Sequence, residues 1–268
     1  MADRFHKMHG LGNDFVLIDA RETPVVMTAE RARALADRRT GIGFDQLILI
    51  EPSTTADARL RFFNADGSEV GACGNGTRAA ALFLGDDTTL ETEAGLLSAR
   101  ARDGMASVDM GQPRFGWDAI PLAYAMDTRA LPLAWGELSG PAAVNVGNPH
   151  AIFFVPDADA VPLDELGSGI EHDPVFPERV NVNVASIASP SHIRLRVWER
   201  GVGLTRACGT GACATAVAAI RAKLVQSPVT VSQPGGELTV AWEEGGSITM
   251  TGPATYLYAG ETDWSRFG

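Results

Sequence analysis

The sequence predicts an α+β protein of two pseudo-symmetric domains, each a mostly antiparallel sheet rolled around a central buried helix. Three observations predict this fold class: a long internal repeat, short strands bounded by turn residues in both halves, and one apolar, alanine-rich helix in each half. We interpret the repeat as a duplication, in which each half supplies equivalent positions.

The repeat relates residues 59–81, RLRFFNADGSEVGACGNGTRAAA, to residues 194–216, RLRVWERGVGLTRACGTGACATA. Nine of the 23 aligned positions are identical without a gap, at an offset of 135 residues, about half of the 268-residue chain. The same offset pairs Gly12-Asn13 with Gly147-Asn148, Gln46 with Asn181, Asn64 with Glu199, and Cys73 with Cys208. We therefore expect a site at the junction, where two related halves face each other.

The first half begins with a surface helix, expected from about residue 29 to 39, with Thr28 as N-cap and a stop at Gly41. Short strands are expected next, separated by turns such as 65–67 and 103–104; they cover residues 47–50, 59–63, 97–101 and 105–109. The second half repeats this pattern, with strands expected at residues 151–155, 192–197, 229–231, 238–242 and 247–251.

Each Ala-Cys-Gly-x-Gly segment leads into a helix, at about residues 76–84 and 211–224, that is apolar nearly all round and is expected to be buried inside its own sheet. The Pro/Gly-rich stretch 111–116 is the expected boundary. We predict an N-terminal domain of residues 1–114, joined by the C-terminal strand 253–268, and a second domain of residues 115–252.

The composition and charge of the chain exclude some classes of binding partner. The chain is 45% apolar and carries a net charge of −11, with a pI near 4.9. Because nucleic acids and anionic membranes would repel it, we expect a small-molecule partner and neither of those two. The N-terminus has no basic stretch followed by a long apolar run, so the protein is expected to be cytoplasmic. Three cysteines fit a reducing compartment, and the Cys208/Cys213 spacing lacks further ligands for a zinc site, so no metal is expected.

The two repeated cysteines carry the chemistry. Backbone N–H groups at a helix start have no intrahelical partner and stabilise an anion, either a thiolate or a bound carboxylate. Two equivalent thiols that converge on one carbon suit stereoinversion, since one removes a proton while the other returns a proton on the opposite face. No cofactor is required, and Rossmann and Walker A glycine patterns are absent from the sequence.

At this point the chain resembles the diaminopimelate epimerase family from end to end. The resemblance rests on eight blocks: Lys7-Met8-His9-Gly10-Leu11-Gly12-Asn13-Asp14-Phe15, Gly43-Phe44-Asp45-Gln46, Phe63-Asn64-Ala65-Asp66-Gly67-Ser68-Glu69, Ala72-Cys73-Gly74-Asn75-Gly76, Gly147-Asn148-Pro149-His150, Glu178-Arg179-Val180-Asn181, Glu199-Arg200-Gly201 and Ala207-Cys208-Gly209-Thr210-Gly211. Any one block alone would be weak.

The resemblance implies interconversion of LL- and meso-2,6-diaminoheptanedioate without pyridoxal phosphate, for lysine and peptidoglycan synthesis. It implies that Cys73 takes the α-proton of the LL isomer and Cys208 that of the meso isomer. The amides of Gly74, Asn75, Gly209 and Thr210 would hold the reacting carboxylate. Further substrate contacts would be Asn13, Gln46, Asn64, Asn148, Asn181, Glu199 and Arg200. His150 and Glu199 would tune the thiols, and a homodimer would use Tyr258 at its interface.

One position departs from the family pattern. Many relatives have Glu-Thr shortly before the second Ala-Cys-Gly, where this chain has Leu204-Thr205. Leu204 is not among the implied contacts, so the change puts only the local loop in doubt.

Plainer readings stay open for several residues. Free cysteines are most often structural, and Cys213 is expected in the core, about 140° round the helix from Cys208. Gly-Asn pairs commonly form ordinary turns. His150 is equally consistent with a structural role and with a role beside the thiols. Glu199 and Arg200 could form an ion pair with each other. A phosphate cradle at the glycine-rich loops lacks the Lys and Ser/Thr of a Walker A loop. The acidic stretches 157–173 and 243–244 are expected to be solvated loop or edge charge.

Two rival functions remain. A two-cysteine proline or hydroxyproline racemase would not need Arg200, Asn64 and Asn181 together, because its substrate has a single compact carboxylate. A thiol redox protein, in which Cys73 and Cys208 form a disulfide, predicts that solvent hydrogen never enters an amino acid.

Overall fold

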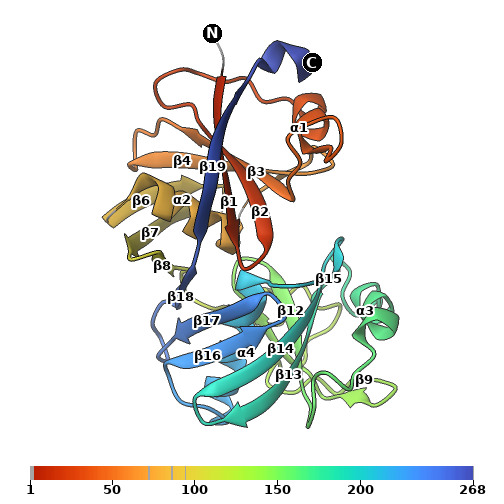
Figure 1. Cartoon of the computed structure of the whole chain (residues 1–268). Coiled ribbons are helices and arrows are strands. Elements are labelled where there is room, and N and C mark those ends of the chain that lie inside the picture. Colours follow the sequence, from red (N-terminus) through yellow and green to blue (C-terminus); the bar gives the residue numbers. More distant parts are fainter. Residues whose placement is uncertain (1–2, 72, 86, 94, 268) are drawn as a thin grey trace. The chain divides into compact units, whose positions relative to one another are not determined.

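The computed structural model describes residues 3–71, 73–85, 87–93 and 95–267, with Asp3 described by its backbone only. Ala72 of the first cysteine motif therefore lies outside the described residues. The chain divides into two compact units, unit 1 of residues 1–109 and 252–268 and unit 2 of residues 110–251. Sequence reasoning placed these limits after residues 114 and 252. Figure 1 shows the elements coloured along the chain.

Unit 1 is a mixed sheet in which antiparallel pairs dominate. β1 pairs antiparallel with β2, β2 parallel with β3, β3 antiparallel with β4, and β4 pairs both with β5 and, in parallel, with β6. β7 and β8 follow as an antiparallel meander. The strands are β1 (Asp3–Gly10), β2 (Asn13–Asp19), β3 (Gln46–Glu51), β4 (Ala58–Asn64), β5 (Glu69–Val70), β6 (Asp87–Thr92), β7 (Gly95–Arg102) and β8 (Met105–Asp109).

Unit 2 repeats this order of pairings. β11 pairs antiparallel with β12, β12 parallel with β13, β13 antiparallel with β14, and β14 pairs both with β15 and, in parallel, with β16. β17 and β18 complete the meander. The strands are β9 (Ala134–Trp135), β10 (Leu138–Ser139), β11 (Ala142–Asn145), β12 (Pro149–Phe154), β13 (Asn181–Ser189), β14 (His192–Glu199), β15 (Gly203–Thr205), β16 (Val229–Gln233), β17 (Gly236–Ala241) and β18 (Thr249–Pro253). The predicted α+β class is confirmed, and the repeat in sequence is also a repeat in topology.

One helix lies inside each sheet, as the alanine-rich pattern predicts. α2 (Gly74–Leu84) packs against strands from both ends of its sheet, including β1, β7 and β8, and α4 (Gly209–Arg221) packs against β11, β12 and β17. The alanines at 79–81 and those at 212, 214, 216, 218 and 219 are buried. Because alanine has no bulk beyond Cβ, strands can approach the helix from all sides, and Cys213 is fully buried among them, as expected.

The outer helices differ from expectation. α1 (Ala29–Ala36) begins at the predicted N-cap Thr28, but it ends three residues early. The reason is local: the Asp37 carboxylate accepts hydrogen bonds from the backbone N–H groups of Arg39 and Thr40, which offers those groups an alternative to the helix. The acidic stretch 157–173, expected as solvated loop or edge charge, contains α3 (Leu163–Glu171), whose last residue is buried although most acidic residues of the stretch are exposed.

The chain returns to unit 1 at its C-terminal end. β19 (Thr255–Thr262) pairs antiparallel with β1, from Asp3 opposite Thr262 to His9 opposite Thr255, as Figure 1 shows by the dark blue strand beside the red one. The short helix η1 (Trp264–Phe267) then buries Trp264 in the core beside α1. Within the described part of the chain, none of the helices is long and apolar enough to cross a membrane.

Candidate active site

Cys73 occupies the N-cap of α2. Its backbone is extended (φ −147°, ψ 107°), and its Sγ accepts a hydrogen bond from the Gly76 N–H at 3.3 Å. The first-turn N–H groups of Gly74 and Asn75 have no acceptor within the helix itself, so this end of α2 favours a negative charge. The sequence therefore places this thiol where a thiolate and a carboxylate are both stabilised.

A buried arginine lies directly behind this helix start. Arg78 is completely buried, and its guanidinium donates to the Asn75 Oδ1 at 3.0 Å and the Gly74 carbonyl at 3.4 Å. Sequence reasoning missed it because an arginine one turn into an apolar helix carries no motif. The contact ties the Asn75 Oδ1 to the first turn of the helix.

Cys208 occupies the equivalent N-cap of α4. Its Sγ accepts from the Gly211 N–H at 3.3 Å and lies 3.5 Å from the Thr210 hydroxyl. Its own N–H donates to the Gln233 Oε1 at 2.8 Å. The side chain is almost fully buried, at 4% exposure, whereas Cys73 is partly exposed. The two cysteines thus share a backbone position but differ in their access to solvent.

Glu199 sets the electrostatics around Cys208. Burial, followed by the negative charge of Glu199, raises the pKa of the Cys208 thiol well above 9.0, against smaller opposing effects of Thr210 and the Gly211 N–H. Burial also raises the pKa of Glu199 itself, although a 2.6 Å hydrogen bond from the Thr205 hydroxyl and a contact with Cys208 oppose the shift. These surroundings therefore disfavour the thiolate form of Cys208.

Asn13 is held by a network of charges in unit 1. It follows a tight turn in which Leu11 and Gly12 both have positive φ, at 56° and 85°. Its Nδ2 donates to the Asp45 Oδ2 at 3.1 Å. Asp45 and Asp14 are in turn bridged by Arg38, and Lys7 donates to Asp14 and to the Gly43 carbonyl.

These cations govern the Asp14 carboxylate. Burial alone would raise the pKa of Asp14, but hydrogen bonds from Arg38 and Lys7 outweigh burial and lower it far below its ordinary value. The Asp14 carboxylate is therefore stabilised in its charged form, and the hydrogen bond from Asn13 to Asp45 in the same network gives Asn13 a fixed orientation.

Gln46 and Asn64 form a second group in unit 1. They lie opposite each other on β3 and β4, and the Gln46 Nε2 donates to the Asn64 Oδ1 at 2.8 Å, while the Asn64 Nδ2 donates to the Ser68 hydroxyl at 3.1 Å. Among the described residues, the buried Oε1 of Gln46 has no hydrogen-bond partner. A buried acceptor of this kind is costly unless a ligand donates to it.

His150 connects Asn148 to the start of α4. It is fully buried, and its Nε2 lies 3.0 Å from the Asn148 Oδ1 while its Nδ1 lies 3.1 Å from the Asn183 Oδ1. Asn183, which sequence reasoning missed, donates both to the Gly211 carbonyl at 3.0 Å and to the Thr215 hydroxyl at 2.9 Å. Burial lowers the pKa of His150 to about 4, so the imidazole is neutral at pH 7.

Asn181 and Arg200 are joined in unit 2. The Asn181 Oδ1 accepts from the Arg200 N–H at 2.9 Å, and its Nδ2 donates to the Pro149 carbonyl at 2.8 Å. The Arg200 guanidinium donates through Nη1 to the Glu178 carbonyl at 3.0 Å. Glu199 and Arg200 thus do not pair with each other: Glu199 turns toward Cys208 and Arg200 toward the exposed surface.

The structure groups the predicted residues by unit. In unit 1, Asn13, the Gln46–Asn64 pair and the start of α2 lie on adjoining elements; in unit 2, one network links Asn148 and His150 to α4, and Glu199 meets Cys208. Most residues missed from the sequence have no counterpart at the repeat offset, since Asn183 falls opposite Ile48 and Gln233 opposite Ser98. Asp45 was detectable, because it precedes Gln46 in a quoted block.

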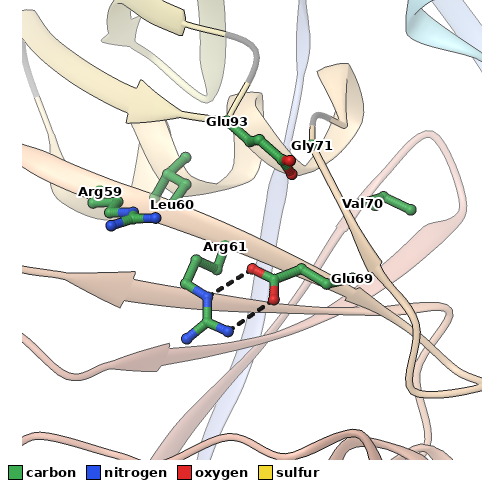
Figure 2. Close-up of a pocket in the computed structure, with 7 residues that line it drawn as sticks. All are labelled: Arg59, Leu60, Arg61, Glu69, Val70, Gly71 and Glu93. Carbon is green, nitrogen blue, oxygen red and sulfur yellow. Dashed lines mark hydrogen bonds and ion pairs between the residues drawn. The ribbon is translucent and has the colours of Figure 1, made fainter.

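A separate surface pocket in unit 1 contains none of the predicted side chains (Figure 2). It has a volume of about 330 Å³ beside β4 and β5, and it is lined in part by Arg59, Arg61, Glu69 and Glu93. Arg61 holds Glu69 with two hydrogen bonds of 2.6 and 2.8 Å. These opposite charges balance one another, so the pocket offers no marked preference for a charged ligand.

Comparison with known proteins gives a family match over most of the chain. The family described as diaminopimelate epimerase matches residues 5–116 and 142–257. The diaminopimelate epimerase of Rhizorhabdus wittichii is 68% identical over 269 residues, covering 100% of this chain and 98% of that protein. That of Sphingopyxis alaskensis is 65% identical over 268 residues, covering 100% of both.

Solved structures share the fold at low identity. An Enterococcus faecalis protein of the PhzF phenazine biosynthesis family superposes with a TM-score of 0.73 at 15% identity, over 98% of this chain and 100% of that one. A hydroxyproline epimerase from Agrobacterium vitis, with bound trans-4-hydroxy-L-proline, gives a TM-score of 0.68 at 16% identity, over 97% and 92% of the two chains. At these identities the likeness concerns the fold.

Proposed function

This chain belongs to the diaminopimelate epimerase family and interconverts LL- and meso-2,6-diaminoheptanedioate; we propose that it does so without a cofactor, with Cys73 and Cys208 as its two bases. The observation that carries the proposal is the repeated N-cap: each Sγ accepts a hydrogen bond from the third residue of a buried helix, at 3.3 Å in both units. We further propose that the enzyme is cytoplasmic and supplies lysine and peptidoglycan synthesis.

The proton transfers follow from the different surroundings of the two thiols. In the LL-to-meso direction, the Cys73 thiolate removes the α-proton, and the electron pair of the C–H bond passes into the carboxylate as an enediolate. The Cys208 thiol then returns a proton to the opposite face of the same carbon, which leaves Cys73 protonated and Cys208 as thiolate. The high pKa of the Cys208 thiol supports its role as the acid in this direction.

The helix starts stabilise the charge that develops. N–H groups of Gly74, Asn75, Gly209 and Thr210 lie in first turns, where no intrahelical carbonyl accepts from them. We propose that they hold the reacting carboxylate, because donors fixed in a buried site stabilise an enediolate without reorganising. This accounts for the two Cys-Gly-x-Gly sequences better than a structural role for either cysteine does.

The remaining polar side chains can be matched to the other charged groups of the substrate. Asn13 offers its amide oxygen as an acceptor for an ammonium group, and Gln46 offers its Oε1, which has no partner among the described residues. Glu199 offers its carboxylate for the same purpose. We propose that Arg200, with Asn64 and Asn148, holds the distal carboxylate, since a guanidinium pairs with a carboxylate through two parallel hydrogen bonds. Asn181 has one N–H left after its bond to Pro149, so it contacts substrate through that N–H or positions Arg200.

The two-base mechanism is tested by solvent exchange. Incubation with LL-diaminopimelate in D2O, without added cofactor, should place deuterium at the α-carbon as the LL/meso ratio changes. Cys73→Ala and Cys208→Ala should each abolish epimerisation. If either variant still epimerises at a rate near that of the unmodified enzyme, the assignment of that cysteine as a base is wrong.

We also propose a homodimer in which Tyr258 lies at the interface. Support comes from β19, where three consecutive large residues are exposed: Tyr256 at 45%, Leu257 at 49% and Tyr258 at 50%. A strand that presents such a run to water is a candidate for association. Light scattering coupled to gel filtration should give twice the mass of the 28.3 kDa chain, and Tyr258→Asp should give the monomer; a monomeric unmodified protein would contradict the proposal.

A further inference from the structure

The buried carboxylate of Glu171 has no part in the mechanism above. It is the last residue of α3, in the stretch whose acidic residues are otherwise mostly at the surface, yet it is only 2% exposed. A carboxylate is placed in such surroundings only where donors satisfy it, because desolvating it without partners costs several kcal/mol. Its donors therefore show what it is there to hold.

Two hydrogen bonds tie Glu171 to the residues that flank Glu199 and Arg200. Its Oε2 accepts from the Trp198 indole N–H at 2.8 Å, and its Oε1 accepts from the Gly201 backbone N–H, also at 2.8 Å. Trp198 is the residue before Glu199, and Gly201 is the residue after Arg200. One carboxylate thus accepts hydrogen bonds from the residues on either side of Glu199 and Arg200, the proposed substrate-binding pair.

The same face of α3 also fixes the indole ring. Gly167 lies one turn before Glu171, and a Cβ added there would come within 2.4 Å of Trp198 Cδ2 and 2.5 Å of Cγ. Gly167 therefore lets the helix backbone lie directly against the ring, while Glu171 holds the ring nitrogen. These two contacts fix the position of α3 relative to the end of β14.

Further contacts complete the support around Arg200. Arg179 lies 3.8 Å from the Glu171 carboxylate and adopts a left-handed backbone (φ 62°). The residue before it, Glu178, supplies the carbonyl that accepts from the Arg200 guanidinium at 3.0 Å. The N–H of Arg200 is held by Asn181, so Glu171 and Asn181 fix successive backbone N–H groups of this turn.

We propose that Glu171 is a positioning residue for the epimerase reaction, which fixes the turn after β14 so that Glu199 and Arg200 meet the substrate. This inference rests on the proposed function, in which those two residues contact the diamino-dicarboxylate. Glu171 acts through them and does not itself touch the substrate. Its donors require two acceptor oxygens, which a carboxylate supplies and an amide does not.

The decisive variant is Glu171→Gln, which keeps the shape but offers one acceptor oxygen to two N–H donors. The amide NH2 then meets either Trp198 or Gly201, and the turn is displaced. We expect KM for LL-diaminopimelate to rise about tenfold, with a smaller change in kcat, because binding contacts are lost while both thiols remain. Glu165→Gln, an exposed residue of the same helix, is the matched control and should leave both constants unchanged.

A double variant separates positioning from simple loss of stability. Trp198→Phe keeps a ring against Gly167 but removes the indole N–H, so the glutamine of Glu171→Gln can give its oxygen to Gly201 without a clash. The double variant should therefore recover most of the lost KM. Effects that instead multiply, or a Glu171→Gln enzyme with the KM of the unmodified enzyme, would overturn the proposal.

Two additional variants decide the question if Glu171→Gln does not fold or if the substrate contact of Glu199 is itself wrong. If Glu171→Gln does not yield folded protein, Trp198→Phe alone decides: a KM raised about threefold supports the proposal, and an unchanged KM overturns it. Glu199→Gln distinguishes the two levels of inference. If it raises KM while Glu171→Gln does not, the positioning role fails alone; if neither changes KM, the proposed substrate contact of Glu199 fails.

Discussion

At the scale of single residues, two cysteines with the same backbone position have different surroundings. Cys73 is partly exposed and has the buried Arg78 behind its helix start, whereas Cys208 is buried beside the Glu199 carboxylate. A nearby negative charge disfavours a thiolate. In the proposed mechanism, Cys208 therefore suits the role of acid in the LL-to-meso direction.

Removing the Glu199 charge should change the pH dependence of the reverse reaction. Glu199 raises the pKa of the Cys208 thiol, so Glu199→Gln should lower that pKa and move the rising limb of the meso-to-LL profile of kcat/KM to lower pH. The value of kcat/KM itself should fall by tenfold or more, on the order of one charged hydrogen bond. A limb that stays in place would mean that Glu199 does not control Cys208.

His150 predicts a loss of stability in mild acid. Its pKa is lowered from 6.5 to about 4 in the folded protein, so its contribution is present above pH 6.5 and is lost as the pH falls toward 4. Between pH 7 and pH 5 the free energy of unfolding should drop by about 2 kcal/mol for this group alone.

Urea unfolding followed by tryptophan fluorescence measures this loss, because four of the five tryptophans (Trp117, Trp135, Trp198 and Trp242) lie in unit 2 with His150. In His150→Gln the same pH change should cost less stability by that amount. Equal slopes in the two proteins would show that His150 is not neutral when folded.

At the scale of elements, the candidate site depends on how closely α2 and α4 approach their sheets. Gly76 and Gly211 are equivalent in the repeat, and so are the strand residues beneath them, Phe62 and Val197. A Cβ on Gly76 would lie 3.0 Å from the Phe62 ring, and one on Gly211 would lie 3.0 Å from the Val197 Cγ2. Each glycine also donates the N–H that the cysteine Sγ accepts. The same residue therefore determines both how closely the helix packs and where the sulfur lies.

Alanine at either glycine should displace the start of its helix. For Gly211→Ala we expect a destabilisation of about 1–3 kcal/mol from overpacking and a fall in kcat of about tenfold or more, because the Cys208 Sγ is displaced. The new Cβ would lie 3.3 Å from that sulfur. Thermal unfolding and steady-state kinetics measure the two effects.

Gly169→Ala is the control for this variant. Its site on α3 is open, since the added Cβ meets nothing within 4 Å, so the protein should gain stability by about 0.5–1 kcal/mol from helix propensity. Full activity and stability in Gly211→Ala would contradict the requirement for a bare backbone at the helix start.

At the scale of the whole molecule, the chain is divided unequally between its units. Unit 2 is one continuous stretch, residues 110–251, whereas unit 1 needs both ends of the chain. β19 covers β1 along its length, and Trp264 enters the unit 1 core. The two units therefore share one topology, but only unit 2 is formed by a single continuous stretch of the chain.

Fragments should reveal this asymmetry. Residues 110–251 should unfold cooperatively as a separate protein, because their core is built from their own residues. Residues 1–109 should not, since β1 keeps β2 but loses β19 as a partner strand, and the core loses Trp264. Joining residues 252–268 directly after residue 109 should restore a cooperative transition, observed by circular dichroism on heating. Cooperative unfolding of residues 1–109 alone would show that β19 is dispensable.

The sequence by itself determined the repeat, the class of fold, the two buried helices and the thiols at their starts. Those features are local: alternation, alanine content and the spacing of Cys-Gly-x-Gly are written in neighbouring residues, so they can be read without a structure. The repeat offset then carried Asn13, Gln46 and Asn64 to their counterparts Asn148, Asn181 and Glu199.

Only the tertiary structure decided which side chains hold these groups in place. Glu171, Asn183 and Gln233 form hydrogen bonds with residues that are 25 to 33 positions away and lie on other elements, and each is an ordinary polar residue until packing buries it. The burial of Glu171 within an acidic stretch shows the reason. Charge and hydropathy describe a residue's own preference, whereas its partners come from strands and helices that meet only after the chain has folded.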